Sequence, residues 1–195
     1  MSNVYLCTAI PYVNGNPHIG HAMDYLLADT YARYRRLIGG AGDEVRLSAG
    51  TDEHGNKVFR SAERAGMSVE EYSKLNSDKF RNFINKMDVT YTDFIRTTDP
   101  EHARRCQEIW QKLTPHIYAA EYDGWYCEGC ESFVTQKEHD ENHGICPDHQ
   151  KPYEHLTEKN YYLRIADFKE QITAAIESDQ MQILPAFRKT EALKL

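Results

Sequence analysis

In the first half of the chain, short apolar runs alternate with longer segments whose apolar residues recur at helical spacing. The runs at 4–9 and 44–49 predict buried strands, and the repeats at 18–38 and 69–87 predict amphipathic helices. Gly39-Gly40 stops the first helix, and Ser68-x-x-Glu71 is a capping box that opens the second. We expect the helices to cover a parallel sheet, with Ile19, Cys7 and Cys106 in the core.

A change of pattern divides the chain near position 115. Asp99-Pro100 predicts a helix start with an aspartate cap and a proline in the first turn. Pro115 and a shift toward tyrosine, glycine, cysteine and acidic residues then mark a boundary, and 165–176 predicts a later amphipathic helix. The expected domains are therefore 1–114 and 115–195.

The composition describes a globular chain with room for one domain and a satellite. The chain has 195 residues, of which 41% are hydrophobic and 27% are charged, and its net charge is −7. It has no long apolar run and no basic N-terminal signal region, so we expect a cytoplasmic protein without membrane contact. The odd number of five cysteines argues against a secreted disulfide framework, and the negative charge requires any nucleic-acid contact to be local.

The segment from Pro11 to His21 joins the first strand to the first helix through His18, Gly20 and His21. The first turn of a helix presents free backbone N–H groups and the positive end of the helix dipole, which favour a phosphate oxygen. The absent side chain of Gly20 lets a flat base or a phosphate approach the backbone, and the imidazoles add further donors. This pattern indicates a nucleotide site, and the alternative is a helix cap with hydrogen-bonded histidines.

A second constellation lies in the C-terminal domain. Cys127-x-x-Cys130 and Cys146-x-x-His149 supply three thiolates and one imidazole, a closed tetrahedral set that suits one structural Zn²⁺. A redox dithiol fits poorly, because it leaves Cys146 and His149 unexplained. His139 and His143 are rival ligands that we expect at the solvated surface, and we expect a polar hairpin tip at 140–144.

Two strings resemble a known family. The string around His18 to His21 resembles the signature of class I aminoacyl-tRNA synthetases, and Ala9-Ile10-Pro11-Tyr12 with Asn14-Gly15 resembles its methionyl-tRNA synthetase form. Gly50-Thr51-Asp52-Glu53-His54-Gly55 matches the same form. The flanks 122–126 and 158–164 resemble the connective peptide of this family with a single zinc knuckle.

The resemblance implies roles for individual residues. His18 and His21 would be catalytic and hold the phosphates of ATP, which arrives with Mg²⁺, and Gly20 would pack under the adenine. Asp52 would take the methionine ammonium group, with Ile10 and Tyr12 lining the substrate end. A carboxylate at the carboxyl edge of a parallel strand suits this task, because open α/β sheets bind ligands there. We expect His54 to orient the loop.

The implied fold is the first half of a class I synthetase Rossmann (HUP-like) sheet, followed by an inserted connective-peptide domain with a zinc knuckle. The second Rossmann half, the KMSKS loop and the anticodon domain are absent from this sequence, so we expect the chain alone to be inactive. The implied partners are methionine, ATP, tRNA(Met) and a separate C-terminal half. Two alternatives stay open: a non-catalytic paralogue that binds a ligand or RNA, and, more distantly, a nucleotidyltransferase outside translation.

Overall fold

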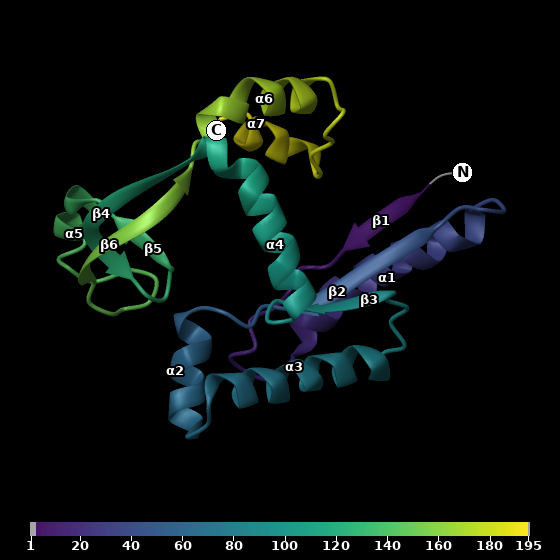
Figure 1. Cartoon of the computed structure of the whole chain (residues 1–195), viewed down its shortest axis with the longest axis horizontal. Coiled ribbons are helices and arrows are strands. Elements are labelled where there is room, and N and C mark those ends of the chain that lie inside the picture. Colours follow the sequence, from purple (N-terminus) through teal and green to yellow (C-terminus); the bar gives the residue numbers. More distant parts are fainter. Residues whose placement is uncertain (1–2, 195) are drawn as a thin grey trace. The chain divides into compact units, whose positions relative to one another are not determined.

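The computed structural model describes residues 3–194. The chain divides into two compact units, an N-terminal unit, Met1–Glu108, and a C-terminal unit, Ile109–Leu195 (Figure 1). The unit boundary lies inside helix α4, Pro100–Leu113. None of the helices described between residues 3 and 194 is long and apolar enough to cross a lipid bilayer.

The N-terminal unit is built on a parallel sheet with the strand order β1-β2-β3. Its strands are β1, Val4–Cys7, β2, Val45–Thr51, and β3, Asp93–Arg96. The register pairs Val4 with Val45 and Ser48 with Asp93. The strands alternate with helices α1, Ile19–Ile38, α2, Asn56–Ala65, and α3, Val69–Lys86. The predicted alternation of strands and helices is confirmed, as are the glycine stop after α1 and the capping box at Ser68.

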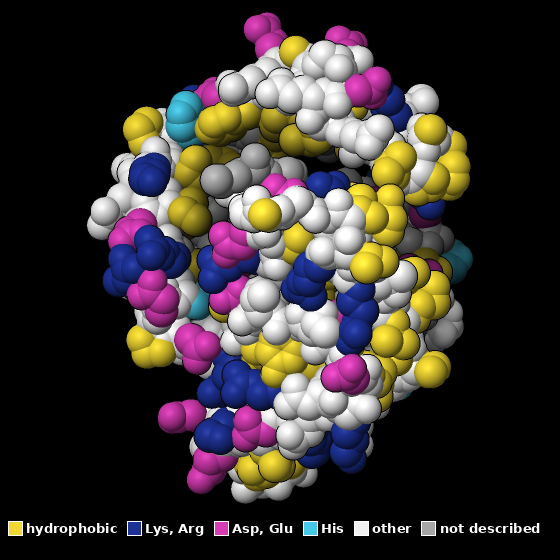
Figure 2. All heavy atoms as spheres, turned by 90° about the vertical axis from the view of Figure 1, so that its right-hand side faces the viewer, with side chains coloured by type: hydrophobic (Ala, Val, Ile, Leu, Met, Phe, Trp, Pro, Cys, Tyr) yellow, Lys and Arg dark blue, Asp and Glu magenta, His cyan; other side chains and the backbone are white. Residues whose placement is uncertain are grey.

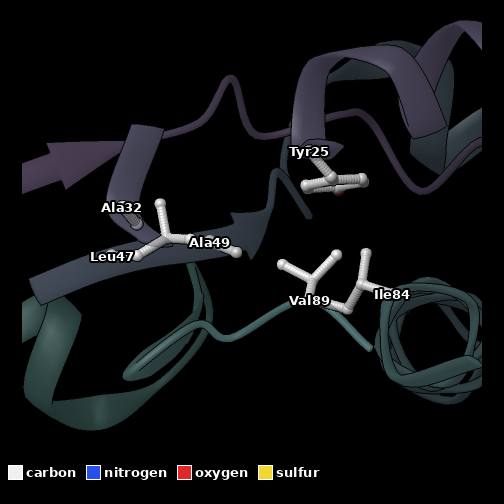
Figure 3. Close-up of a cluster of buried hydrophobic side chains, with 6 residues drawn as sticks. All are labelled: Tyr25, Ala32, Leu47, Ala49, Ile84 and Val89. Atoms are coloured by element: carbon white, nitrogen blue, oxygen red, sulfur yellow. The ribbon is translucent and has the colours of Figure 1, made fainter. Parts of the chain in front are cut away.

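The main core of this unit forms where α1 and α3 meet one face of β2. Leu47 and Ala49 point from β2 toward side chains of α1, of α3 and of the segment after α3, as Figure 3 shows. The remaining buried members of this cluster are Tyr25, Ala32, Ile84 and Val89. Burying each of the larger apolar side chains contributes roughly 1.5–3 kcal/mol, so this cluster fixes both helices against the sheet.

Helix α1 buries a different face from the one that its apolar repeat suggests. Its buried residues are Ala22, Tyr25, Asp29 and Ala32, whereas its leucines, its isoleucines and Met23 lie at the surface. Ile19 is 85% exposed, so the expectation that it lies in the core is wrong. Tyr25 and Ala32 pack in the core cluster with Leu47, and the apolar stripe is left on the outer side.

The two cysteines outside the metal constellation are also exposed, which contradicts the prediction that they are core residues. Cys7 ends β1, which has a single hydrogen-bonded neighbour strand within the described residues. Cys106 lies on α4, and no residue of this fully described helix is buried. Helix α4 therefore does not cover the sheet as expected.

A buried carboxylate ties α1 to the segment that enters β3. The side chain of Asp29 accepts hydrogen bonds from Arg33 Nε at 2.7 Å and from the Thr90 backbone N–H at 2.8 Å. Thr90 Oγ1 donates to the same carboxylate. Burial opposes ionisation of Asp29, but the hydrogen bonds from Thr90 and Arg33 outweigh it and hold its pKa below the usual value.

The C-terminal unit contains an antiparallel sheet with the strand order β5-β4-β6. Strands β4, Ile117–Cys127, and β6, Glu154–Leu163, form a long ribbon, and β5, Ser132–Val134, pairs with the far end of β4. The helical segments are η1, Thr114–His116, α5, Gln136–Glu141, η2, Ile165–Phe168, α6, Lys169–Glu177, η3, Ala186–Arg188, and α7, Lys189–Ala192. Helix α5 covers part of 140–144, so the expected hairpin tip is wrong. Thr135 and Glu138 form a capping box that starts this helix.

We expect Asp29→Asn to lower the free energy of unfolding at neutral pH by about 1.5–3 kcal/mol, because the buried hydrogen bonds lose their charged acceptor. The folded-state pKa of Asp29 lies below its unfolded value. Its contribution is therefore complete above the unfolded pKa of about 3.9, and is lost as the pH falls through the folded pKa. Urea unfolding followed by circular dichroism measures both effects. Asp24→Asn, on the exposed side of α1, is the matched control, and equal losses in both variants would contradict this role.

Candidate functional site

The two histidines of the first motif form the N-terminal cap of α1. The Nδ1 atom of His18 accepts a hydrogen bond from the backbone N–H of Gly20 at 3.1 Å. In return, the Nδ1 atom of His21 accepts from the backbone N–H of His18 at 3.2 Å. The two rings stack with their centroids 3.7 Å apart. Each imidazole therefore satisfies one backbone donor of the first turn.

These hydrogen bonds fix the tautomer of both rings. An Nδ1 atom that accepts a hydrogen bond carries no proton, so in the neutral ring the proton resides on Nε2. Burial, together with the nearby His18 ring, lowers the pKa of His21, and the carboxylate of Asp24 opposes this shift only in part. His21 is consequently neutral at pH 7. It presents one Nε2–H donor to a ligand.

The histidine turn opens on a hollow of about 320 Å³ that is lined by the loop before α1 and by one residue of α3. Its lining residues are Pro11, Tyr12, Asn14, Gly15, Asn16, His18, His21 and Phe80. A Cβ atom on Gly20 would lie only 3.0 Å from the ring of His18. Glycine at this position therefore leaves room for the ring over the helix start.

Asp52 lies beside this loop because backbone hydrogen bonds join it to residues 11–13, beyond the ends of β1 and β2. The backbone N–H of Asp52 donates to Pro11 O at 2.9 Å, and Val13 N–H donates to Asp52 O at 3.1 Å. The residue between them, Tyr12, forms an isolated parallel bridge with Asp52. The segments that carry the two sequence motifs thus meet at the carboxyl edge of the sheet.

Ile10 lies against β2 at the same edge. A Cβ atom on Gly50 would come within 2.2 Å of Ile95 O and 3.3 Å of Ile10 Cγ2. Only glycine fits at this point of β2, where the backbone of β3 approaches closely. Ile10, Tyr12 and Asp52 are therefore brought to one region, as the sequence analysis expected.

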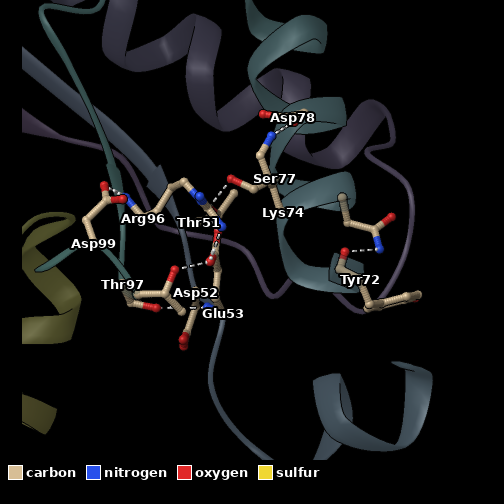
Figure 4. Close-up of polar contacts among 12 residues, drawn as sticks. Thr51, Asp52, Glu53, Tyr72, Lys74, Ser77, Asp78, Arg96, Thr97 and Asp99 are labelled. Carbon is tan, nitrogen blue, oxygen red and sulfur yellow. Dashed lines mark hydrogen bonds and ion pairs between the residues drawn. The ribbon is translucent and has the colours of Figure 1, made fainter. Parts of the chain in front are cut away.

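The next residue, Glu53, forms a buried ion pair that the sequence analysis did not identify. Its side chain is 0% exposed and accepts two hydrogen bonds from Arg96, at 2.8 and 2.9 Å. Thr98 Oγ1 also donates to it. Figure 4 shows Glu53 with Arg96 and with Thr51, whose Oγ1 donates to it at 3.2 Å. Burial opposes ionisation of Glu53, but the hydrogen bonds from Arg96 and Thr98 hold its pKa below the usual value.

This network fixes the turn that carries Asp52 and His54. The backbone N–H of Glu53 donates to Thr97 Oγ1 at 2.9 Å, and a ring nitrogen of His54 is 3.2 Å from Thr97 O. The backbone N–H of His54 donates to Asp52 Oδ1 at 3.3 Å. These contacts support the expectation that His54 orients the loop. The sequence signal for this ion pair is weak, because Glu53 is the second of two carboxylates after β2, while Arg96 ends the neighbouring strand β3.

In the C-terminal unit, Cys127, Cys130, Cys146 and His149 converge so that their ligand atoms all lie within 4.8 Å of one another. Cys130 Sγ is 3.5 Å from Cys146 Sγ and 3.3 Å from His149 Nδ1. The Nδ1 atom of His149 is 3.9 Å from Cys127 Sγ and 3.7 Å from Cys146 Sγ. In a tetrahedral zinc site with Zn–S bonds of about 2.3 Å and Zn–N bonds of about 2.0 Å, two ligand atoms lie roughly 3.5–3.8 Å apart. The set therefore has the size and donor chemistry of a structural zinc site.

The thiols of this set cannot all ionise without a compensating charge. Burial opposes ionisation of Cys146, but hydrogen bonds with His149, Cys127 and Cys130 lower its pKa to about 6. Hydrogen bonds with Cys146 and Cys127 raise the pKa of Cys130 to about 12. Adjacent thiolates repel each other, and a divalent cation at their centre removes the conflict.

Gly129 leaves room for the ring of His149 in this cluster, because a Cβ atom at position 129 would lie 2.3 Å from that ring. The two rival histidines lie outside the cluster. His139 stacks on Trp125 with the ring centroids 3.9 Å apart, and its Nδ1 atom is 3.0 Å from Asp140 Oδ1. His143 is exposed and has a left-handed backbone conformation, with φ at 52°.

Comparison with known proteins places this geometry in a family. The family model described as "tRNA synthetases class I (M)" matches residues 4–156. A methionine–tRNA ligase of Thermotoga maritima is 36% identical over 197 residues, which cover 98% of this chain and 30% of the relative. One of Clostridium tetani is 37% identical over 191 residues, which cover 97% of this chain and 29% of the relative. The chain thus spans less than a third of the length of these relatives.

A solved structure agrees with this assignment. Mycobacterium tuberculosis methionyl-tRNA synthetase in complex with methionyl-adenylate matches with a TM-score of 0.86 and 30% sequence identity. The match covers 100% of this chain and 38% of that chain. The sheet, the paired motifs and the family match lead to one conclusion: the chain belongs to the class I tRNA synthetases of the methionyl type.

Proposed function

We propose that the chain is the N-terminal part of a methionyl-tRNA synthetase, and that the complete enzyme binds ATP and methionine, forms methionyl-adenylate and charges tRNA(Met). The observation that carries this proposal is that two backbone hydrogen bonds join Asp52 to Pro11 and Val13, at the start of the loop that leads to the histidine turn. This contact supports a common site for the two motifs. The relatives reported above are all named as ligases or synthetases, so they support this function and not the alternative of a non-catalytic module.

His18 and His21 donate hydrogen bonds to the phosphates of ATP in this proposal. In adenylate formation a methionine carboxylate oxygen bonds to the α-phosphorus, and the bond from that phosphorus to the pyrophosphate oxygen breaks. Negative charge builds on the phosphoryl oxygens, and donors placed in advance stabilise it. The Nε2–H groups, fixed by the two Nδ1 hydrogen bonds, serve as such donors. Gly20 leaves space for the adenine, and Mg²⁺ enters with ATP as part of the substrate.

Asp52 binds the ammonium group of methionine, and Ile10 and Tyr12 line the substrate end of the site. A carboxylate and an ammonium group form a charge-assisted hydrogen bond, which is shorter and stronger than a neutral one. The buried Glu53 remains paired with Arg96 and so takes no part in substrate binding. One carboxylate is thus available to substrate, and its neighbour holds the turn.

Cys127, Cys130, Cys146 and His149 hold one structural Zn²⁺, which keeps this end of the C-terminal unit folded. The apolar core here consists of Cys127, Cys146 and Tyr153, with Trp125 and Val134 packed against it. A core of this size cannot stabilise a lobe by itself, and metal binding supplies folding free energy. We assign the C-terminal unit to the connective peptide and the N-terminal unit to the first Rossmann half.

The remaining part of the enzyme covers the apolar stripe of α1 and the free edge of β1. The stripe consists of Ile19, Met23, Leu26, Leu27, Tyr31, Tyr34, Leu37 and Ile38, all exposed. A groove of about 330 Å³ runs along its first half. Hydrophobic side chains lie at the surface of the face drawn in Figure 2, among basic and acidic groups. In doubly wound sheets the first strand is internal, so β1 is the edge at which a second half pairs.

The complete enzyme works in the cytoplasm, where methionine, ATP and tRNA(Met) are its partners. The net charge of −7 gives this chain no general attraction for tRNA. Contacts with tRNA in this part of the enzyme are therefore few and local.

We expect about one Zn²⁺ per chain by elemental analysis, because the donor set satisfies tetrahedral geometry. Cys146→Ser should lose the metal and disorder roughly residues 120 to 160, while amide exchange in the parallel sheet stays unchanged. Cys106→Ser is the matched control and should retain the metal, since Cys106 lies outside the cluster. A metal content near zero in wild-type protein purified without chelator would rule out the zinc assignment.

We expect His18→Ala and His21→Ala to weaken binding of ATP about ten- to a hundredfold by calorimetry, with less effect on methionine. Asp52→Asn should show the opposite preference, because it removes the partner of the ammonium group. His102→Ala, a histidine of the N-terminal unit outside the site, is the control. Equal effects of the three site variants on both ligands would mean that they act through folding.

We expect the chain alone to show almost no methionine-dependent ATP–pyrophosphate exchange, and to gain activity when the remaining part of a synthetase is added as a second polypeptide. The chain supplies donors for the α-phosphate, but the loop that stabilises departing pyrophosphate lies in the remaining part. Loss of one such donor costs roughly a hundred- to a thousandfold in rate. Exchange by the chain alone within about a hundredfold of a full synthetase would refute this account.

A further inference from the structure

Helix α3 contacts the loop that leads to the paired histidines at two points outside the histidine turn itself. Tyr72 Oη donates a hydrogen bond to Asn14 O at 3.2 Å. Two turns further along the helix, Lys79 Nζ donates to Asn16 Oδ1 at 3.2 Å. Residues seven positions apart lie on one face of a helix. A single face of α3 therefore holds both asparagines of the loop.

The ammonium group of Lys79 is itself fixed by its own helix. It donates to Asn76 Oδ1 at 2.9 Å. Asn76 is only 2% exposed, and its Nδ2 atom donates to Tyr72 O at 3.0 Å, which fixes the orientation of the amide. Both oxygens that Lys79 contacts belong to neutral amides. The lysine therefore brings a full positive charge to the loop.

The loop needs such support because its middle has little regular structure. At one end Val13 N–H donates to Asp52 O, and at the other end the helix begins after His18. Between these points Pro17 lacks an N–H group, and a Cβ atom on Gly15 would have nothing within 4 Å. Ordering a segment of this kind costs conformational entropy, and a binding site whose loop is already ordered avoids that cost when ligand binds.

We propose that Lys79 and Tyr72 are positioning residues of the nucleotide site: they fix Asn16 and Asn14, and so hold the loop in the conformation that aims the two imidazoles at the phosphates. The inference rests on the proposed function, because it takes this loop as the ATP site. It deepens that function by assigning residues of α3 that lie outside both sequence motifs. Neither residue touches the reacting atoms in this assignment.

The first test compares Lys79→Met with Lys86→Met. Lys86 lines the same surface hollow of about 390 Å³ as Lys79 and Asn16, so the two variants lose the same charge in the same region. Calorimetry on the whole chain should show ATP binding weakened about tenfold in Lys79→Met and less than about twofold in Lys86→Met. Methionine binding should change less than about twofold in both. Equal losses of ATP affinity would overturn the proposal, because bulk charge would then explain the effect.

A second test asks whether Lys79 acts through Asn16. Lys79→Met, Asn16→Ala and the double variant form a double-mutant cycle for ATP binding. If the lysine works by holding the asparagine, the double variant should bind ATP about as weakly as the weaker single variant. Additive losses would overturn the positioning role.

A third measurement does not depend on a ligand. Lys79→Met and Tyr72→Phe should raise amide hydrogen exchange at residues 14–21 at least about fivefold, with β2 unchanged and with Lys86→Met like wild type. Unchanged exchange in the loop would overturn the inference even if ATP binds. If the wild-type chain binds no ATP while exchange in the loop responds as expected, the proposed function fails and the positioning contacts stand.

Discussion

The buried ion pair between Glu53 and Arg96 is the interaction on which the site depends. It joins the carboxyl ends of β2 and β3 with two hydrogen bonds to a carboxylate that is 0% exposed. Removing one partner of such a pair leaves an uncompensated buried charge and costs about 3–5 kcal/mol. The adjacent Asp52 is thereby fixed, and its backbone in turn holds Pro11 and Val13. The end of β2 thus anchors the start of the loop that leads to the histidine turn.

The two units obtain their stability from different sources. The N-terminal unit has an apolar cluster between β2, α1 and α3, together with two buried carboxylates that are held by hydrogen bonds. The knuckle end of the C-terminal unit has a small core and a cluster of thiols in which hydrogen bonds lower the pKa of Cys146 and raise that of Cys130. Changes at the thiol cluster are therefore expected to affect the knuckle, and changes at the sheet to affect the loop before the histidine turn.

The features predicted from sequence are those that local spacing determines. The strand–helix alternation, the cap at Ser68 and the convergence of Cys127, Cys130, Cys146 and His149 follow from residue type and separation along the chain. The faces that become buried do not follow from spacing. The apolar repeat of α1 correctly indicated a helix, but its stripe is exposed, because periodicity reveals an apolar face without revealing whether this chain or another covers it. Helix α5 was missed because its polar sequence has no apolar periodicity. The Thr135–Glu138 capping box was a sequence signal for its start.

The sequence analysis named the motif residues of the candidate site but not the residues that support them. Glu53, Arg96, Tyr72 and Lys79 are ordinary surface residue types, and their roles arise from contacts between segments that are 43 and 58 to 63 positions apart. Such pairings depend on the fold and cannot be read from either segment alone. Sequence reasoning therefore named candidate chemical groups, and the structure adds the contacts that hold them in place.

The proposal that the histidine turn and Asp52 form one site for methionyl-adenylate can be checked by crystallography. The decisive measurement is a crystal structure of the chain with a non-hydrolysable analogue of that adenylate. The account expects the phosphate-mimicking group within hydrogen-bond distance of Nε2 of His18 or His21, and the ammonium group against the carboxylate of Asp52. An analogue bound elsewhere, or one that contacts the imidazoles through Nδ1 with its ammonium group away from Asp52, would contradict it.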